Sequence, residues 1–520
     1  MISQLQPSTF AEFQRQLNRG NVVAVTRTIA DAFVHPVDAF VSVAGAATYA
    51  FLFESVEGKE SVAKYSFLGA DPYLIVRGRG ELTTIERNGR IEMLHECVPD
   101  FLRRHFSKNK LADAAGGGPL AGGAVGFLGY GAANWFEPAL NRAAAVQPQT
   151  AAANPQTDEA LLMFYRTLVT FDHVQQKTRI VSVVFTDEAR GDQLRLEKLY
   201  DAAVRETEQI ERQLRSFSSP SSSDDSFSKR DRTFASDELA ARTSVRSNWS
   251  REGFQRAVRE VKEHILAGDC YQVVLSQRFM TSTTADAVAI YSALRRSNPA
   301  PYTYLLRLGR ESIIGASPEM LVRCRDRELN YRPIAGTRPR GVNAIEDAQL
   351  AEEMQNDEKE VAEHMMLVDL GRNDLGRVAE FGSVAVDELL TVERYSRVQH
   401  LVSSLRARLR DGYDRFDALA ACFPAGTVSG APKVRAMEII RELEPDSRGV
   451  YAGAILYVDY AGNLDSCIAI RTIVLKEGEA AVQAGAGIVA DSVPEREYEE
   501  TVHKAGALFR AIEMAEAEEY

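Results

Sequence analysis

The chain has 520 residues, of which 45% are hydrophobic and 26% are charged. These proportions are typical of a folded protein of two to four domains, and they exclude a disordered chain, a fibrous repeat and a small disulfide-stapled protein. The 73 acidic residues outnumber the 61 Lys and Arg residues and give a formal net charge of −12, which disfavours binding to nucleic acids and to anionic membranes. A site for an anionic substrate must therefore be locally positive.

The sequence contains no signal for export or for a membrane anchor. Its five cysteines are widely spaced and form no CxxC pair, which argues against a disulfide framework and against a zinc site. The first twenty residues contain no apolar block. Two uncharged stretches, residues 39–53 and 114–136, are too short or too rich in glycine for a membrane-spanning helix, and we interpret both as buried strands and turns. We therefore expect a cytoplasmic protein with no membrane segment.

In chain order, the first elements indicate an α/β lobe. A Gly-rich block covers residues 122–131, alternating apolar runs cover residues 161–172, and a charged helical stretch covers residues 187–214. The segment 216–228 has eight serines among thirteen residues and cannot bury enough apolar surface to offset its ordering entropy. The sequence therefore predicts an N-terminal lobe (1–215), a Ser-rich surface connector (216–232) and a C-terminal domain (233–520).

The C-terminal domain opens with a helix that leads into a strand. Phe254, Val258 and Val261 fall on one helix face, and Gly268 is a candidate for the C-terminal cap. The strand is predicted at residues 270–279. The chain has no repeat of fixed period, no heptad array and no basic patch interleaved with aromatic residues, which disfavours solenoids, coiled coils and nucleic-acid binding.

Two acidic helices predicted further along the chain each carry a pair of glutamates three residues apart. The pairs are Glu360 with Glu363 and Glu497 with Glu500. This spacing places both carboxylates of a pair on one helix face, and two such faces can form an oxygen site for a hard divalent cation such as Mg2+. The alternative is an ordinary solvent-exposed face, on which Glu500 pairs with Lys504 four residues later.

Two small-residue turns can present backbone N–H groups to an anion. The first covers residues 422–435 and offers the Thr427 hydroxyl, and the second covers residues 483–492 with Gly485 and Gly487. The alternative for both is that the glycines serve only the turn. Neither segment fits GxxxxGK[ST] or GxGxxG, so the sequence supports neither a P-loop nor a dinucleotide-binding fold.

Two individual residues are also candidates for a functional site. Arg471 is predicted inside an apolar strand over residues 466–474, and a buried arginine requires an anionic partner, usually a carboxylate. His400 lies between Val398 and Leu401 and is either a satisfied core histidine or a catalytic one.

Taken together and in order, these segments resemble the chorismate-utilising enzymes, and within them the large subunits of anthranilate synthases. The motifs are GASPEM (315–320), PIAGTRPRG (333–341), VDLGRNDLGRV (368–378), HLVS (400–403), FPAGTVSGAPKVRAMEII (423–440), IAIRT (468–472) and QAGAGIVADS (483–492). The resemblance is dense over residues 249–515 and thinner over residues 49–172. It implies an α+β fold, a large sandwich of antiparallel β-sheets with helices packed outside.

The resemblance also implies a substrate site. One carboxylate of chorismate would be held through Mg2+ on Glu363 and Glu500 with Glu360 and Glu497 close by, and the other by Arg471 and Tyr451. Glu319 would be the general acid that protonates the departing ring hydroxyl, and His400 and Thr427 would act in the step that expels pyruvate. The other residues expected around the ring are Gly336, Thr337, Gly485, Ala486, Gly487 and Lys504.

Two positions discriminate among the members of the family that this chain resembles. Isochorismate-forming members activate water with a lysine where this chain has Gln272, so ammonia becomes the expected nucleophile. Aminodeoxychorismate synthases carry an attacking lysine in the middle of PIxGT, where this chain has Ala335. Both differences favour formation of anthranilate and pyruvate from chorismate and ammonia, the first step of tryptophan biosynthesis, with aminodeoxychorismate synthesis as the alternative.

The resemblance implies partners as well. No cysteine lies in a GxCxG turn, so a separate glutamine amidotransferase small subunit is expected to supply ammonia within a hetero-oligomer. LFES (52–55) and NPAPYTYL (298–305) resemble the family's feedback pocket for L-tryptophan, although Phe53 and Thr303 stand where relatives more often have Leu and Met. The residues expected to line this pocket are Glu54, Ser55, Pro301, Tyr302, Thr303, Ile455 and Tyr457.

An alternative of another class is a catalytically inert paralogue that senses tryptophan, since a fold does not fix a function. The joint presence of the expected acid, metal-binding and anion-binding residues disfavours it, because drift would erase some of them. These residues are Glu319, Glu363, His400, Arg471 and Glu500.

Overall fold

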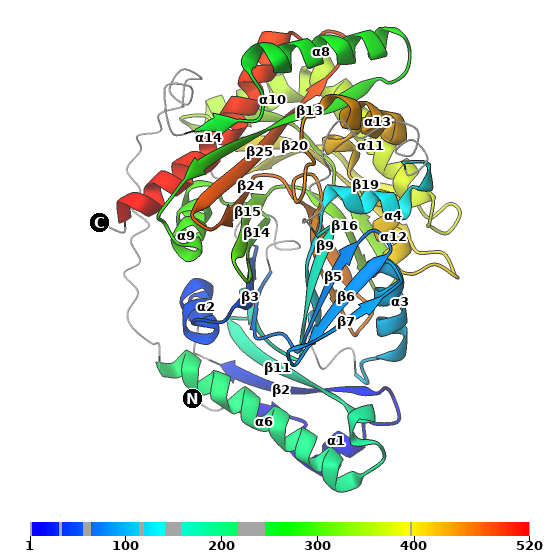
Figure 1. Cartoon of the computed structure of the whole chain (residues 1–520), viewed down its shortest axis with the longest axis vertical. Coiled ribbons are helices and arrows are strands. Elements are labelled where there is room, and N and C mark those ends of the chain that lie inside the picture. Colours follow the sequence, from blue (N-terminus) through cyan, green and yellow to red (C-terminus); the bar gives the residue numbers. More distant parts are fainter. Residues whose placement is uncertain are drawn as a thin grey trace.

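The computed structural model describes residues 3–30, 34–55, 64–113, 119–140, 158–216, 245–395 and 398–518. Two large antiparallel sheets face each other, and helices cover their outer surfaces (Figure 1). This architecture confirms the predicted sandwich of antiparallel sheets with helices outside.

The first sheet has thirteen strands in the described part of the chain, in the order β1-β2-β11-β10-β4-β3-β14-β15-β24-β25-β13-β12, with β21 also paired to β13. Its strands are β1 (Ser3–Gln6), β2 (Val22–Ala30), β3 (Tyr49–Glu54), β4 (Tyr65–Ala70), β10 (Thr167–Asp172), β11 (Lys177–Phe185), β12 (Arg246–Ser247), β13 (Gln272–Ser282), β14 (Tyr302–Leu308), β15 (Glu311–Ser317), β21 (Gly430–Ala431), β24 (Thr472–Lys476) and β25 (Glu479–Ile488).

The second sheet has twelve strands among the described residues, in the order β18-β20-β17-β16-β23-β22-β8-β9-β5-β6-β7, with β19 also paired to β20. Its strands are β5 (Leu74–Arg79), β6 (Leu82–Arg87), β7 (Arg90–Leu94), β8 (Gly123–Leu128), β9 (Ala160–Tyr165), β16 (Met320–Arg325), β17 (Glu328–Tyr331), β18 (Ile334–Pro339), β19 (Ala385–Arg394), β20 (Val398–Arg408), β22 (Ala454–Asp459) and β23 (Leu464–Ile468).

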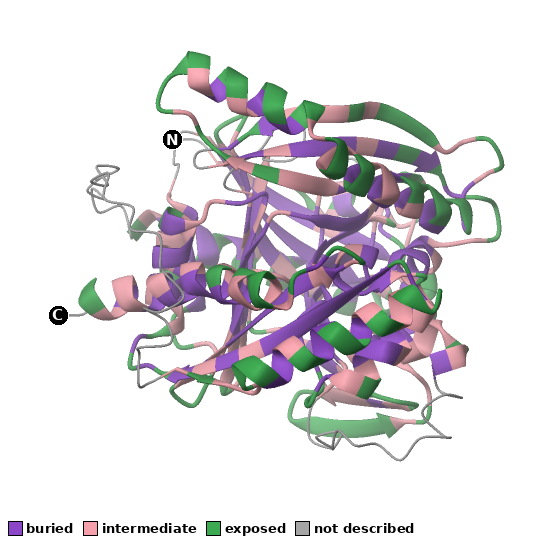
Figure 2. Ribbon diagram, turned by 90° about the horizontal axis from the view of Figure 1, so that it is seen from above, coloured by how far each residue is buried: buried purple, intermediate pink, exposed green. Residues whose placement is uncertain are grey.

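The core has an inner layer between the sheets and outer layers beneath the helices. The inner layer joins Phe51 and Tyr304 of the first sheet to Phe127 and Tyr457 of the second. The helices turn buried faces to the sheets and exposed faces outward (Figure 2). They are α1 (Phe10–Gln14), α2 (Pro36–Ala44), α3 (Val98–Lys108), α4 (Ala133–Phe136), α6 (Gln193–Ser216), α8 (Arg251–Leu266), α9 (Ala287–Ser297), α10 (Ala344–Asn356), α11 (Glu358–Gly376), α12 (Arg415–Cys422), α13 (Lys433–Leu443) and α14 (Pro494–Glu518).

Both halves of the chain build both sheets. In the first sheet β3 pairs with β14, and in the second β8 pairs with β22. Nearly all of the predicted Ser-rich connector, from residue 217 to residue 232, lies outside the described residues, so the division of the chain at this point stays a prediction. No helix among the described residues is long and apolar enough to cross a membrane.

Most elements predicted near the site form where the sequence placed them. Helix α8 ends at Leu266, and Gly268 follows with a positive φ of 82°. Both acidic helices form, as α11 and α14. Two predictions were wrong. Residues 39–44 belong to helix α2 rather than to a strand or turn, because Pro36 and the accepting side chain of His35 begin a helix there.

The second correction concerns Arg471, which lies between β23 and β24 and not inside a strand. Its φ of 50° is left-handed, a conformation that ends a strand and redirects the chain. The apolar residues on both sides had suggested one continuous strand.

Candidate active site

Glu319 lies directly between β15 and β16, where its carboxyl is buried with only 6% of the residue exposed. Burial raises the pKa of this carboxyl to about 8, and the nearby Thr427 hydroxyl offsets part of the rise. That hydroxyl is buried and forms no full hydrogen bond with any described residue. Glu319 is therefore mostly protonated at neutral pH, as a general acid must be.

His400 is held in one tautomer by strand pairing. Its β20 position lies directly opposite Thr337 of β18, and its Nδ1 is 3.0 Å from the Gly336 carbonyl oxygen and 3.0 Å from the Thr337 hydroxyl. A carbonyl can only accept, so Nδ1 carries the proton and Nε2 is left as an acceptor. Burial lowers the pKa of His400, and the charge of Arg471 lowers it further. The imidazole is thus neutral and able to accept a proton.

The four glutamates predicted for the metal come together from α11 and α14. Partial burial raises the pKa of Glu363, and repulsion from Glu360 and Glu500 raises it further. Burial and the charge of Glu500 likewise raise the pKa of Glu497. Mutual repulsion among these carboxylates marks a place where a cation is favourable.

Two neighbouring cations already neutralise part of this negative charge. Lys504 lies 2.6 Å from Glu500, so the i, i+4 ion pair considered as an alternative in the sequence analysis does form. Arg338 lies 2.9 Å from Glu360. Within the described ranges, no three His, Cys, Asp or Glu side chains are grouped so as to hold a metal by themselves. Mg2+ usually takes one or two carboxylates with water and substrate, so Glu363 and Glu500 still suit it as a donor set.

Arg471 is a cation with no carboxylate of its own. It forms no ion pair with any described acidic side chain, and burial lowers its pKa, while Tyr451 and Glu500 act in the opposite direction. A partly buried guanidinium without an acidic partner among the described residues favours a bidentate anion. Arg471 therefore provides the locally positive point that a protein of net charge −12 needs to bind an anion.

The Gly485–Gly487 segment lies beside these groups. The Tyr451 hydroxyl packs so closely on Gly485 that a Cβ there would lie 2.7 Å from it. Lys504 donates to the Gly485 carbonyl at 3.0 Å, and the Gln272 amide lies against Gly487. Ala486 is buried between the two glycines on β25. The predicted residues at the end of β25 and those on α14 are thus neighbours.

Gly336 connects the His400 group to the carboxylates. Its φ is 57°, and a Cβ there would lie 3.3 Å from a Glu360 oxygen, so a side chain would be both strained and crowded. The contacts of Gly336, Arg471 and Lys504 therefore bring the predicted catalytic, substrate-binding and metal-binding residues into one region.

A cavity opens beside Gln272. It is lined by Met366, Leu370 and Asn373 of α11 and by Gly426 and Ala431 of the small-residue turn. Gly426 precedes Thr427, so this mostly apolar cavity ends next to the groups that surround Glu319.

A second cavity lies between the two sheets. All seven residues predicted for tryptophan line it: Glu54, Ser55, Pro301, Tyr302, Thr303, Ile455 and Tyr457. The Glu54 carboxylate is already bound by the Tyr291 hydroxyl at 2.6 Å and by Arg295 at 3.1 Å.

Sequence reasoning missed several polar residues of this second cavity. Asp465 lies 3.2 Å from the Tyr302 hydroxyl and 3.5 Å from Arg325, and Lys64 and Arg323 complete the charged wall. These residues lie outside the quoted motifs; the pairing of β16, β22 and β23 brings Asp465, Arg323 and Arg325 together, and Lys64 comes from just before β4 in the facing sheet.

Comparison with known proteins identifies the family of this chain. The profile described as chorismate binding enzyme matches residues 50–510. The chain belongs to the family of chorismate-binding enzymes. A protein named anthranilate synthase component 1 from Acetivibrio thermocellus is 46% identical over 468 residues, which cover 89% of this chain and 90% of that protein.

Solved structures agree on the fold. The crystal structure of anthranilate synthase component I from Streptococcus pneumoniae TIGR4 matches with a TM-score of 0.70 at 35% identity, over 86% of this chain and 92% of that chain. The menaquinone-specific isochorismate synthase MenF from Escherichia coli matches with a TM-score of 0.65 at 18% identity, over 98% and 99% of the two chains. The second match supports the fold alone, so function has to be argued from the site.

Proposed function

We propose that this chain is the large subunit of an anthranilate synthase, which converts chorismate and ammonia to anthranilate and pyruvate. The observation that carries the proposal is Arg471, a cation without a carboxylate partner among the described residues, set near paired glutamates and close to His400. A substrate with two carboxylates suits such a site, because one can pair with the arginine and the other with a cation held by the glutamates. The 46% identity to a protein named anthranilate synthase component 1 supports the same assignment.

Substrate binding is assigned to residues on both sides of the ring. Arg471 and Tyr451 grip one carboxylate, and the Gly485–Gly487 amides, Gly336, Thr337 and Lys504 surround the remaining substituents. Glu363 and Glu500 hold Mg2+, with Glu360 and Glu497 close by. When bound, the ion supplies positive charge for the second carboxylate.

Glu319 acts first in the chemistry. Its protonated carboxyl gives a proton to the ring hydroxyl, which leaves as water while ammonia forms the new C–N bond. The Nε2 atom of His400 then accepts the ring proton, the bond between the ring and the enolpyruvyl oxygen breaks, and the ring becomes aromatic; the enolpyruvate that leaves takes up a proton on its methylene carbon and becomes pyruvate. Thr427, next to Glu319, orients the groups in this second step.

Ammonia is assigned to the cavity beside Gln272. The cavity has room for a small neutral nucleophile, its wall is mostly apolar, and its one end lies against Gln272 and the Gly426 turn. A neutral amide at position 272 does not activate water as a base, which leaves ammonia as the nucleophile. A glutamine amidotransferase small subunit supplies that ammonia in the assembled enzyme.

The second cavity is assigned to L-tryptophan as a feedback inhibitor. It joins aromatic walls from Phe53, Tyr302 and Tyr457 to charged groups of both signs, Arg325 and Asp465, as an aromatic amino acid requires. Glu54 and Asp465 are each paired with an arginine, Arg295 at 3.1 Å and Arg325 at 3.5 Å, and both are assigned to the side of the cavity that receives the ligand's ammonium group.

The proposed function is tested with the purified chain, chorismate, Mg2+ and an ammonium salt at alkaline pH, which increases the share of free ammonia. Anthranilate fluorescence is the expected result. Formation of aminodeoxychorismate would establish the alternative enzyme, and tryptophan binding without any turnover would establish the inert sensor. The Glu319→Gln variant is the matched negative control.

A further inference from the structure

A fully buried ion pair joins Glu444, which caps the C-terminal end of α13, to Arg448 four residues later. Their side chains are 4% and 1% exposed, and two hydrogen bonds of 2.6 and 2.8 Å connect them. Burying two charges costs free energy unless every donor and acceptor is satisfied. The contacts of this pair therefore indicate what it does.

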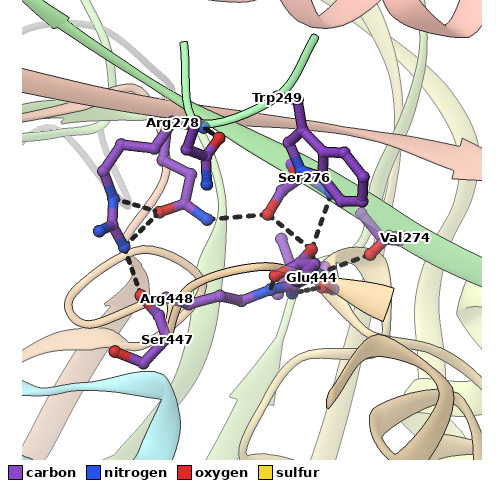
Figure 3. Close-up of polar contacts among 10 residues, drawn as sticks. Trp249, Val274, Ser276, Arg278, Glu444, Ser447 and Arg448 are labelled. Atoms are coloured by element: carbon purple, nitrogen blue, oxygen red, sulfur yellow. Dashed lines mark hydrogen bonds and ion pairs between the residues drawn. The ribbon is translucent and has the colours of Figure 1, made fainter. Parts of the chain in front are cut away.

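The Glu444–Arg448 pair binds backbone groups of β13 on the edge that faces away from β25. On that edge β21 pairs with residues 272–273 and β12 pairs with residues 279–280, which leaves a gap between them. In the gap, Arg448 donates to the Val274 carbonyl at 2.7 Å, and Glu444 accepts from the Ser276 backbone N–H at 2.8 Å (Figure 3). The two side chains thus replace a missing strand.

Val274 and Ser276 lie on the strand next to the Gly485–Gly487 segment of the proposed substrate site. In the register of β13 and β25, Val274 lies opposite Gly487 and Ser276 lies opposite Gly485. Gln272 is two residues before Val274 on the same strand. A shift of β13 by a fraction of an ångström would therefore move both the glycine segment and Gln272.

Arg448 also reaches two further parts of the site. It donates to the Val428 carbonyl at 2.7 Å, next to Thr427, and its guanidinium lies 5.6 Å from the Tyr451 ring. One planar guanidinium thus contacts strand β13, the Thr427 turn and the segment before β22. Glu444 keeps this cation charged, since its carboxylate outweighs the burial that would lower the pKa of Arg448.

We propose that Arg448 and Glu444 are positioning residues that set the relative placement of β13, Thr427 and Tyr451 for chorismate. The proposal rests on the proposed function only in the identity of the substrate. The forked guanidinium can bind two carbonyls and a carboxylate at once, whereas a lysine ammonium cannot reproduce that planar geometry.

The test compares Arg448→Lys with Arg415→Lys. Arg415 is a matched control, because it is also buried, binds the Asp459 and Asn463 carbonyls at 2.8 and 3.0 Å, and stacks on Phe106, away from the site residues. Both variants should lower the unfolding midpoint. Only Arg448→Lys should lower kcat/KM for chorismate, by about 10- to 100-fold, and weaken chorismate binding measured by calorimetry with Mg2+.

Equal kcat, KM and chorismate affinity in wild type and Arg448→Lys would overturn the proposal and make the pair purely structural. If Arg448→Lys does not fold, Glu444→Gln decides, because its single amide oxygen can still accept from the Ser276 N–H, while the charge and the oxygen that accepts from Arg448 Nε are lost. Wild-type kinetics and affinity in that variant would also overturn it. If wild type binds chorismate but makes no anthranilate, the proposed function fails, and the affinity comparison still judges the positioning role. If wild type does not bind chorismate, both proposals fall.

Discussion

Glu319→Gln removes a buried carboxyl whose pKa of about 8 keeps it mostly protonated at neutral pH. The substitution preserves shape and burial and removes the transferable proton. General acid catalysis contributes about 10²- to 10⁴-fold, so turnover should fall by that factor. A pKa of about 8 leaves about 90% of the wild-type carboxyls protonated at pH 7 and about 10% at pH 9.

The assay is anthranilate formation with saturating Mg2+, expressed per concentration of free ammonia so that ammonium titration does not mask the enzyme. Wild-type kcat/KM for chorismate should fall about tenfold per pH unit above pH 8, and the residual activity of Glu319→Gln should lack this alkaline limb. A wild-type profile that stays level to pH 9.5, or a glutamine variant with a comparable rate, would refute the role of Glu319.

The raised pKa of Glu319 also predicts how the free energy of unfolding changes with pH. Its pKa rises from 4.5 in the unfolded chain to about 8 in the folded protein, so between these values the folded state holds the extra proton and stability falls as pH rises. The loss is complete above pH 8 and amounts to at most about 5 kcal/mol. Glu319→Gln should lack this loss, and denaturant unfolding of both proteins at pH 5 and pH 8.5 measures it.

Four further changes test the other assignments. Glu363→Ala should weaken apparent Mg2+ affinity by at least about 10- to 100-fold with an unchanged circular dichroism spectrum. Glu495→Ala, on the exposed side of α14, should leave the Mg2+ affinity unchanged. If both variants depend on Mg2+ equally, Glu363 is an ordinary solvent-exposed residue and not a metal ligand. His400→Met should let the amino intermediate accumulate, seen by chromatography, and wild-type rates would contradict its role. Ser55→Phe should fill the second cavity and relieve tryptophan inhibition without changing the ammonia-dependent rate; persistent inhibition would move the feedback site elsewhere. Leu370→Trp should raise the KM for ammonium and leave that for chorismate, and the reverse would place ammonia entry elsewhere.

Local sequence patterns predicted the helices and strands that carry the site residues, but they did not predict the contacts between those residues. The i, i+3 glutamates of α11 and the glycines of β25 are visible because helix and strand periods are short. The Gly336–His400 hydrogen bond depends on β18 pairing with β20 across about sixty intervening residues, and no local signal encodes that register. The tautomer of His400 could therefore come only from the structure.

The Arg471 error has a similar cause. Apolar residues flank it on both sides, so the hydrophobic pattern extends through a residue whose backbone is left-handed. A single positive φ at a non-glycine residue leaves no compositional trace, although it decides where the guanidinium lies. Arg448 was missed for another reason: Glu444 is only four residues away, but the Val274 and Val428 carbonyls that reveal its role lie 174 and 20 residues away in sequence.

The placement of the second cavity gives a physical route for feedback. Ile455 and Tyr457 on β22 and Asp465 on β23 line it, while Tyr451 precedes β22 and Arg471 follows β23. The β22–β23 hairpin therefore carries residues proposed for tryptophan along its length and residues proposed for chorismate at its two ends. A ligand regulates only through a difference in its contacts between two states, and a shift of this hairpin would change both sets of contacts together. The proposed inhibition would then require no direct overlap between tryptophan and chorismate, because one pair of strands carries residues of both proposed sites.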